Sequence, residues 1–373
     1  MSKIYFVSPF YPYRGGIAQF SDSLANMLES SQKVEKINYK RLYPSLLFPG
    51  KSQFVDGYDK SEKNIPKGID SLNVLSSFKL ILNIKKEVGN TVLLNVYWMS
   101  FFAPILGFIC KFTPKKVKKI ALIHNLIPHE TRFFDSILTR FYVNQQDAFI
   151  VLSEKVKQDV LKLKPDAKVL ALFHPLYDHF GVKVDKYIAR EKYGISSDKK
   201  VLLFFGLIRE YKGLDVLLHA LAELDDSYVL IIAGECYGGF DNYQDIIDRK
   251  RLKNKIVHLD CFVPDPEIQY LFSATDVCVL PYKNATQSGV TAVALHFDLP
   301  IVATNVGALY EYIKDDFTGK LVPPNNSFEL AQALKKVTNP NVLESMTREI
   351  KEFKKNLSWE KFSDELKAFI ESV

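Results

Sequence analysis

The residues with the clearest chemical potential are those that could hold a phosphate group. The stretch Thr286-Gln-Ser-Gly-Val290 joins a buried apolar run, Val277 to Leu280, to a segment with helical spacing. Ser288 is the expected N-cap of that helix. A helix N-terminus presents unpaired backbone N–H groups and the positive end of the helix dipole, so it binds phosphate readily. The corner formed by Gln287, Ser288, Gly289 and Val290 is therefore a predicted anion site, although a simple cap and tight turn would give the same pattern.

A second loop carries two cations. Gly206-Leu-Ile-Arg-Glu-Tyr-Lys-Gly213 follows the apolar run Lys200 to Phe205 and precedes a helical segment, Leu214 to Leu224. Arg209 and Lys212 are thus placed on a strand-to-helix loop. Two positive side chains there can hold a diphosphate and neutralise the charge of a departing phosphate. A solvated basic loop is the alternative.

The start of the chain offers a diglycine in a similar position. Gly15 and Gly16 stand between a predicted strand, Lys3 to Ser8, and a helix from about Ile17 to Leu28. Two glycines at this point let the backbone approach a phosphate or a sugar closely. A loop that merely needs positive φ explains them equally well.

A histidine follows another predicted strand of the first half. His124 comes directly after the run Ile120 to Ile123, at the edge of a parallel sheet where polar groups meet ligands. A histidine bonded to neighbouring backbone groups is the competing explanation. His129 and Glu130 follow in the same predicted loop.

These loops belong to two successive runs of alternating strands and helices. The alternation stops at His174 to Tyr187, a stretch with Pro and Gly and no clear period, and then restarts. Alternation of this kind predicts an α/β fold with doubly wound parallel sheets, here in two domains. The predicted strands are Lys3 to Ser8, Thr91 to Trp98, Ile120 to Ile123, Ala148 to Leu152, Lys200 to Phe205, Tyr228 to Ala233, Val277 to Leu280 and Ile301 to Thr304. Helices are predicted, among others, over Phe133 to Asn144, Glu154 to Leu163 with Ser153 as its cap, Phe328 to Val337, Asn341 to Phe353 and Trp359 to Ile370.

Composition narrows the class of protein. The chain has 373 residues, of which 47% are hydrophobic and 25% charged, as in globular proteins with two cores. A net charge of +6 suits phosphorylated ligands or an anionic membrane surface but falls short of a nucleic-acid-binding signature. The four cysteines form no CxxC pair, and no leader peptide is visible, so reduced cysteines and a cytoplasmic location are expected. Tyr39 to Pro66 is expected to be a long excursion on the acceptor side.

One apolar segment leaves two explanations open. Met99 to Phe112 is apolar on nearly all sides and precedes Lys115-Lys116-Val117-Lys118-Lys119. A buried crossover helix is favoured, because Ser100, Pro104 and Gly107 interrupt the run. A peripheral membrane contact through 99–119, at the inner face of the membrane, is the alternative.

Taken together, several ordered segments resemble the retaining glycosyltransferases of the GT-B fold, family four, also named glycosyl transferases group 1. The strongest are FFGLIREYKGLDVLLHAL at 204–221 and DVCVLPY…SGV…LPIVATNVGALYEYIKDDFTGKLVPP at 276–324. SPFYPYRGGIAQF at 8–20, ALIHN at 121–125 and the tryptophan-led terminal helix support them. The resemblance implies two Rossmann-like domains facing a cleft: an acceptor-side domain at 1–178, a donor domain at 179–355, and a terminal helix at 356–373 packing back on the first.

The resemblance also implies roles for particular residues. Gly15 and Gly16 would contact the donor phosphate or sugar, and His124 the transferred sugar. Lys212 would hold the diphosphate together with Arg209 and the Gly206 loop. Phe262 and Val263 would meet the base. Gln287, Ser288, Gly289 and Val290 would complete the donor site. The implied reaction transfers a hexose-type sugar with retention, from a donor such as a UDP- or GDP-sugar to a saccharide or lipid-linked acceptor in surface-polysaccharide synthesis, with no metal or other cofactor and no nucleic acid.

Two departures from the family pattern stand out. Most relatives carry Arg directly after the glycine of the second loop, where this chain has Leu207. The family's paired glutamates correspond to Ala285 and Val293, although a subset of the family has Thr-Gln-Ser-Gly-Val at this place and Thr286 or Gln287 could substitute. Two other functions therefore stay open: an inactive partner subunit that only binds nucleotide sugar, and a nucleotide-sugar epimerase of the same fold.

Overall fold

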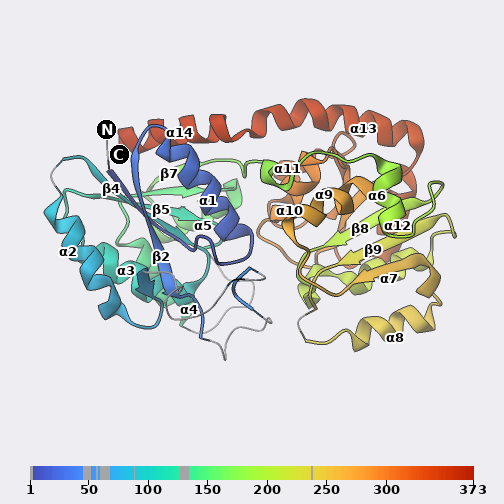
Figure 1. Cartoon of the computed structure of the whole chain (residues 1–373), viewed down its shortest axis with the longest axis horizontal. Helices are drawn as coiled ribbons and strands as arrows, with labels where there is room; N and C mark the ends of the chain where they lie inside the picture. Colours follow the sequence, from blue (N-terminus) through green and yellow to red (C-terminus); the bar gives the residue numbers. More distant parts are fainter. Residues whose placement is uncertain are drawn as a thin grey trace. The chain divides into compact units, whose positions relative to one another are not determined.

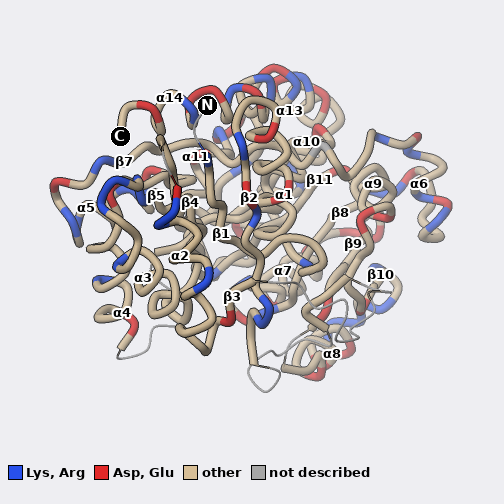
Figure 2. Tube along the Cα trace, turned by 60° about the vertical axis from the view of Figure 1, so that its left-hand side comes forward, with Lys and Arg blue, Asp and Glu red and all other residues tan. Residues whose placement is uncertain are grey.

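The computed structural model describes residues 3–44, 52–55, 58, 68–87, 89–126, 134–236 and 238–373. The chain divides into two compact units (Figure 1). Unit 1 comprises Met1–Phe173 together with Trp359–Val373, and unit 2 comprises His174–Ser358. The sequence had suggested divisions after residues 178 and 355. Both signs of charge occur on each unit (Figure 2).

Unit 1 is built on a seven-stranded parallel sheet with the order β3-β2-β1-β4-β5-β6-β7. Its inner strands are nearly continuous apolar runs, as expected for strands covered on both faces. The strands are β1 (Lys3–Val7), β2 (Lys33–Arg41), β3 (Gly68–Asp70), β4 (Thr91–Tyr97), β5 (Lys118–Ile123), β6 (Ala148–Val151) and β7 (Lys168–Ala171).

The helices of unit 1 are α1 (Gly16–Glu29), α2 (Phe78–Lys86), α3 (Ala103–Phe112), α4 (Asp135–Val143), α5 (Glu154–Leu163) and the C-terminal α14 (Trp359–Ser372). Ser153 caps α5 as predicted, with its hydroxyl accepting a hydrogen bond from Val156 N at 3.2 Å. The buried-crossover explanation for α3 is also confirmed, since Ile105, Leu106 and Ile109 are buried.

The C-terminal helix completes the core of unit 1. The ring of Trp359 packs 5.3 Å from that of Phe20 on α1, and the ring of Phe362 lies 5.8 Å from Phe20 and 5.9 Å from Phe173, centroid to centroid. The terminal helix thus packs on the first unit, as predicted.

Unit 2 is built on a six-stranded parallel sheet with the order β10-β9-β8-β11-β12-β13. Its strands are β8 (Lys200–Phe205), β9 (Tyr228–Ala233), β10 (Ile256–Leu259), β11 (Val277–Leu280), β12 (Ile301–Thr304) and β13 (Gly319–Val322). Its helices are α6 (Lys186–Lys192), α7 (Leu214–Ala222), α8 (Asp241–Arg249), α9 (Asp265–Ala274), α10 (Gly289–His296), α11 (Leu309–Tyr312), α12 (Ser327–Val337) and α13 (Pro340–Phe353). Both units also contain short 3-10 helices. Those of unit 1 are η2 (Val74–Ser77) and η3 (Ser100–Phe102), and those of unit 2 are η4 (Asp178–Phe180), η5 (Glu210–Lys212), η6 (Lys253–Lys255) and η7 (Lys354–Leu357).

The start predicted for the long excursion, Tyr39 to Pro66, is too early in the chain. Tyr39 to Arg41 form the end of β2, and Tyr39 itself is buried. The remainder of that stretch lies mostly outside the described residues, as do His129 and Glu130. Among the helices of the described ranges, none is both long and apolar enough to cross a bilayer.

Candidate donor-phosphate site

The predicted site residues of unit 2 meet at the carboxyl ends of β8 and β11. Gly206 follows β8 with φ +93°, and a Cβ placed on it would lie 3.1 Å from Nζ of Lys212 and 3.9 Å from Cγ2 of Val290. The glycine thus leaves room for the lysine head group beside the first turn of α10. Three residues from two separate loops, each predicted from sequence, come together here.

Lys212 is buried, with the residue 9% exposed. Burial and, to a smaller extent, the positive charge of Arg209 together lower its pKa from 10.5 to about 8. Its Nζ lies 5.7 Å from the ring centroid of Tyr282, and no described residue accepts a hydrogen bond from it. A buried cation without an anionic partner is costly, and an entering phosphate would relieve that cost.

The N-terminus of α10 lies at the same spot. Ser288 occupies the N-cap position with extended backbone, as predicted, but its hydroxyl makes no capping bond. That hydroxyl instead pairs with the hydroxyl of Tyr282 at 3.1 Å. Ser288 is therefore the N-cap residue, as predicted, but its side chain makes no capping bond because the contact with Tyr282 engages the oxygen. The N–H of Thr291 donates to the Ser288 carbonyl at 3.2 Å, so the N–H groups of Gly289 and Val290 at the start of the helix are those suited to a phosphate.

A tyrosine that sequence analysis missed borders this corner. A Cβ placed on Gly289 would lie 3.2 Å from the hydroxyl of Tyr177. The Tyr177 hydroxyl in turn lies 3.2 Å from Nε2 of His174, and the backbone N–H of His174 donates to the Tyr312 hydroxyl at 2.6 Å. Tyr177 lies in the stretch that sequence analysis treated as a boundary, and no local pattern there points to a ligand.

The two positions of the missing glutamates are apolar and buried. Ala285 is 6% exposed and Val293 is 4% exposed. Gly307 packs directly on the Ala285 backbone, since a Cβ on that glycine would lie 2.0 Å from the Ala285 carbonyl oxygen. Neither side chain can accept a hydrogen bond from a ribose hydroxyl. Leu207, which replaces the family's arginine, is exposed.

The predicted base-binding turn follows β10. Val263 is buried and Phe262 is half-buried, and Pro264 is the N-cap of α9. The turn is placed in the same unit as the phosphate corner, and its role stays a prediction.

The remaining predicted residues belong to unit 1. Gly15 is the N-cap of α1 with φ +110°, and Gly16 is the first residue of that helix. His124 follows β5 and is buried; its backbone N–H donates to the Tyr97 carbonyl at 2.9 Å, and its ring packs edge-on against Phe20 with centroids 5.0 Å apart. Both features lie beyond carboxyl ends of strands, as the sequence predicted.

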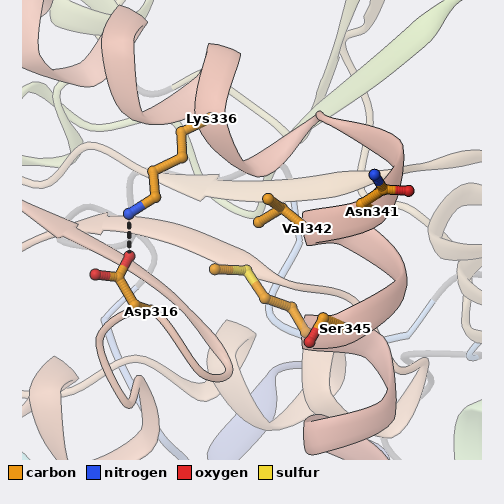
Figure 3. A pocket seen from close by; sticks show the side chains of 6 residues that line it. Asp316, Lys336, Asn341, Val342 and Ser345 are labelled. Carbon is orange, nitrogen blue, oxygen red and sulfur yellow. Dashed lines mark hydrogen bonds and ion pairs between the residues drawn. The ribbon is translucent and has the colours of Figure 1, made fainter.

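Metal ligands were not expected. Over the described residues, no group of three or more His, Cys, Asp or Glu side chains could hold a metal ion. A hollow of 280 Å³ elsewhere on unit 2 is lined by Asp316, Lys336, Asn341, Val342, Ser345 and Met346 (Figure 3). An ion pair of 2.7 Å between Asp316 and Lys336 spans it. This hollow adjoins the turn that leads into β13, at the amino end of the strand, and none of the predicted site residues lines it.

Comparison with known proteins found a family model that matches most of the second unit. Residues 185–356 match the family model of glycosyl transferases group 1. The chain is 24% identical over 96% of its length to an uncharacterized glycosyltransferase of Methanocaldococcus jannaschii, of which it covers 95%. It is 30% identical to a D-inositol 3-phosphate glycosyltransferase of Saccharomonospora viridis over 48% of this chain and 44% of that protein. The glycosyl transferases group 1 match thus supports the family resemblance for unit 2.

Solved structures share the fold over the whole chain. Sucrose-phosphate synthase from Thermosynechococcus elongatus has a TM-score of 0.79 at 15% identity, with 100% of this chain and 99% of that chain covered. Anabaena HepE, crystallised in complex with UDP-glucose, has a TM-score of 0.74 at 14% identity, with both chains fully covered. The predicted fold class, two Rossmann-like units of the GT-B type, is confirmed.

Proposed function

We propose that this protein is a retaining glycosyltransferase that moves a hexose-type sugar from a nucleotide sugar to a saccharide or lipid-linked acceptor. The observation that carries the proposal is the buried ammonium of Lys212 beside Gly206 and the first turn of α10. A dianionic diphosphate fits a site made of a cation and helix N–H groups. HepE, which shares the fold, has been crystallised with UDP and with UDP-glucose, which supports a UDP-sugar as the first donor to test.

The chemistry expected of this corner is stabilisation of the leaving group. As the bond between the anomeric carbon and the β-phosphate oxygen breaks, negative charge grows on that oxygen. Lys212, Arg209 and the N–H groups of residues 288–290 would stabilise it. The acceptor oxygen bonds to the anomeric carbon on the same face, and its proton passes to the departing phosphate. No carboxylate nucleophile and no metal enter this scheme.

In unit 1 the proposal assigns Gly15 and Gly16 to the donor phosphate or sugar and His124 to the transferred sugar. In unit 2 it assigns Phe262 and Val263 to the base and Gln287 to the sugar. Work at the cytoplasmic face of a membrane, in the synthesis of a surface polysaccharide, is the setting that we infer for such a reaction.

The first experiment is a thermal-shift panel of UDP, GDP, ADP and their common sugars. A ligand bound only by the folded state raises the melting temperature. Wild type should respond to one nucleotide, and Lys212→Met should lose about 10- to 100-fold in affinity for it, as expected when charge-assisted hydrogen bonds are removed. Lys250→Met is the matched control, because Lys250 is exposed and has no part in the site.

Turnover separates the competing functions. A transferase releases nucleotide only when an acceptor is present, and an epimerase converts the donor alone. Retention is read from the anomeric configuration of the product by NMR. A donor that raises the melting temperature but is never consumed would favour the inactive partner subunit, the second candidate, for which buried Ala285 and Val293 are the motivating observation.

A further inference from the structure

Unit 1 exposes an apolar strip on the outer side of η2 and α2. Leu80, Ile81 and Ile84 of α2 are buried and attach the helix to the unit. On the opposite side Leu75, Phe78 and Leu82 are 64%, 47% and 53% exposed. They are spaced three and four residues apart, so they follow one another along one helix face. A helix that has already buried one apolar stripe has no internal reason to expose a second.

The strip continues onto α3. The ring of Phe78 lies 5.9 Å from that of Phe108, and the ring of Phe108 lies 4.6 Å from that of Phe112, which is exposed. Leu75, Phe78, Leu82, Phe108 and Phe112 thus form one continuous patch, named here the α2–α3 surface. Exposed apolar patches with polar rims mark sites of contact with proteins or membranes.

The rim of this surface is cationic. Helices α2 and α3 contain no Asp or Glu, and they carry no red in Figure 2. The exposed lysines of the rim are Lys79, Lys85, Lys86, Lys111 and Lys115. None of these five forms an ion pair with any residue that the structure describes.

Two carboxylates that flank η2 and α2 in the sequence are already occupied. Glu87, directly after α2, accepts hydrogen bonds from the Lys3 ammonium and the Tyr5 hydroxyl. Asp70, before η2, is held by Arg41 at 2.9 and 2.6 Å. Within the described residues, the positive charge of the rim is therefore not neutralised by these two carboxylates.

We propose that the α2–α3 surface binds the face of a lipid bilayer that contains anionic phospholipids. An apolar helix face with aromatic residues, bordered by lysines, is the pattern that lies flat at the boundary between head groups and acyl chains. Lysines at such a rim interact with anionic head groups. A second copy of this chain fits less well, because a symmetric contact would set lysine against lysine.

The inference goes beyond sugar transfer, because lipid binding requires no donor and no turnover. It overlaps the membrane contact at 99–119 considered from the sequence only at the end of α3 and just after it, in Phe108, Lys111, Phe112 and Lys115. Phe102 is fully buried, Lys118 donates to the Val373 carbonyl, and Lys119 pairs with Asp147. The contact surface is instead formed by the outer face of α2, which sequence analysis did not predict, with the end of α3.

The test is flotation of the full chain with vesicles of phosphatidylcholine alone or mixed with phosphatidylglycerol. Wild type should float only with the mixed vesicles, and less so at high salt. Two triple variants should each reduce this binding by at least about tenfold. They are Leu75→Ser/Phe78→Ser/Leu82→Ser and Lys79→Glu/Lys86→Glu/Lys111→Glu.

Matched controls alter exposed residues of the same kinds on unit 2. Tyr187→Ser/Ile188→Ser and Lys250→Glu/Lys253→Glu should float as wild type does. Circular dichroism and melting temperature show that each variant is folded. The proposal is overturned if wild type floats with neither vesicle, or if neither triple variant binds less. A third outcome also overturns it: wild type does not float, light scattering shows that it is a dimer, and only the apolar triple variant is a monomer. In that case a second copy of the chain covers the surface.

Discussion

The hydroxyl oxygens of Tyr282 and Ser288 lie 3.1 Å apart, which ties the N-cap of α10 to the residue that closely follows β11. The N-cap hydroxyl is thereby turned away from the backbone N–H groups that it would otherwise occupy. Helix α10 therefore lacks the stabilising N-cap side-chain hydrogen bond at the end where we expect a phosphate to bind.

Tyr282→Phe should therefore weaken nucleotide binding while keeping the ring beside Lys212. Once released, the Ser288 hydroxyl can accept a hydrogen bond from the N–H of Val290 and compete with the phosphate. We expect about a fivefold loss of affinity by calorimetry, the equivalent of the ~1 kcal/mol that a capping bond contributes. Tyr310→Phe, on an exposed residue, is the control. Tyr282→Phe/Ser288→Ala has no competing hydroxyl and should bind more tightly than Tyr282→Phe; weaker binding would argue against this explanation.

Lys212→Met should stabilise the ligand-free protein at neutral pH. The pKa of Lys212 is lowered to about 8 by burial, so the unfolded chain holds the proton more tightly than the folded protein. The contribution of this lysine to stability therefore rises between pH 8 and 10.5, as the folded form loses its proton first. At pH 7 the variant should be more stable by up to about 3 kcal/mol, and the difference should shrink toward about pH 10.

Urea unfolding across this pH range measures the difference between Lys212→Met and wild type. Lys250→Met provides the baseline for removing an exposed lysine. A variant that is less stable than wild type at pH 7 would mean that an acceptor inside the protein already satisfies the ammonium.

Gly206→Ala should disturb both the backbone and the cation. The new methyl group would lie 3.1 Å from the Lys212 Nζ, at a residue whose φ is +93°. We expect a loss of about 1–2 kcal/mol in unfolding free energy and a marked loss of nucleotide affinity. Gly194→Ala has the same kind of strain, at φ +65°, with open space around the Cβ. Gly194→Ala should lose stability but keep its affinity for the nucleotide in a thermal-shift titration. Equal losses of nucleotide affinity in Gly194→Ala and Gly206→Ala would contradict the prediction.

Phe362→Ala should destabilise unit 1 selectively. The side chain is fully buried between Phe20, Trp359 and Phe173, and deleting a buried phenyl ring costs about 3–5 kcal/mol. Hydrogen exchange should accelerate in α1 and α14 and stay unchanged in the strands of unit 2. Phe328→Ala, at a residue 61% exposed on α12, should change stability by less than about 0.5 kcal/mol. Hydrogen exchange that accelerates equally in both units would show that the packing of α14 does not stabilise unit 1 alone.

The elements that could be predicted from sequence are those whose pattern reflects burial on both faces. The runs at β8, β9, β11 and β12 are apolar except for Lys200 and Thr304 at their ends, and their predicted bounds agree with the structure. Strand β2 was missed because its sequence, KVEKINYKR, is charged, and most of its residues are partly or fully exposed. Helix α2 was missed because it is short and has apolar residues on its outer side as well.

The candidate site divides in the same way. Lys212, Gly206 and Val290 could be predicted because each stands next to a strand or helix end that the sequence marks clearly. The orientation of the Ser288 hydroxyl could not, since it depends on a contact with Tyr282. The position of Tyr177 against Gly289 depends on residues far apart in the chain, which no local pattern reports.

The placement of α14 in unit 1 affects how the protein folds during synthesis. The sequence of unit 2 is inserted between the two segments of unit 1. The ribosome therefore completes His174–Ser358 before it makes the helix that packs on Phe20. Unit 2 can fold as a nascent domain, while unit 1 keeps part of its core open until translation reaches the C-terminal helix. A nascent chain stalled before Trp359 should therefore expose the α1 face to chaperones, and release of the last residues would close it.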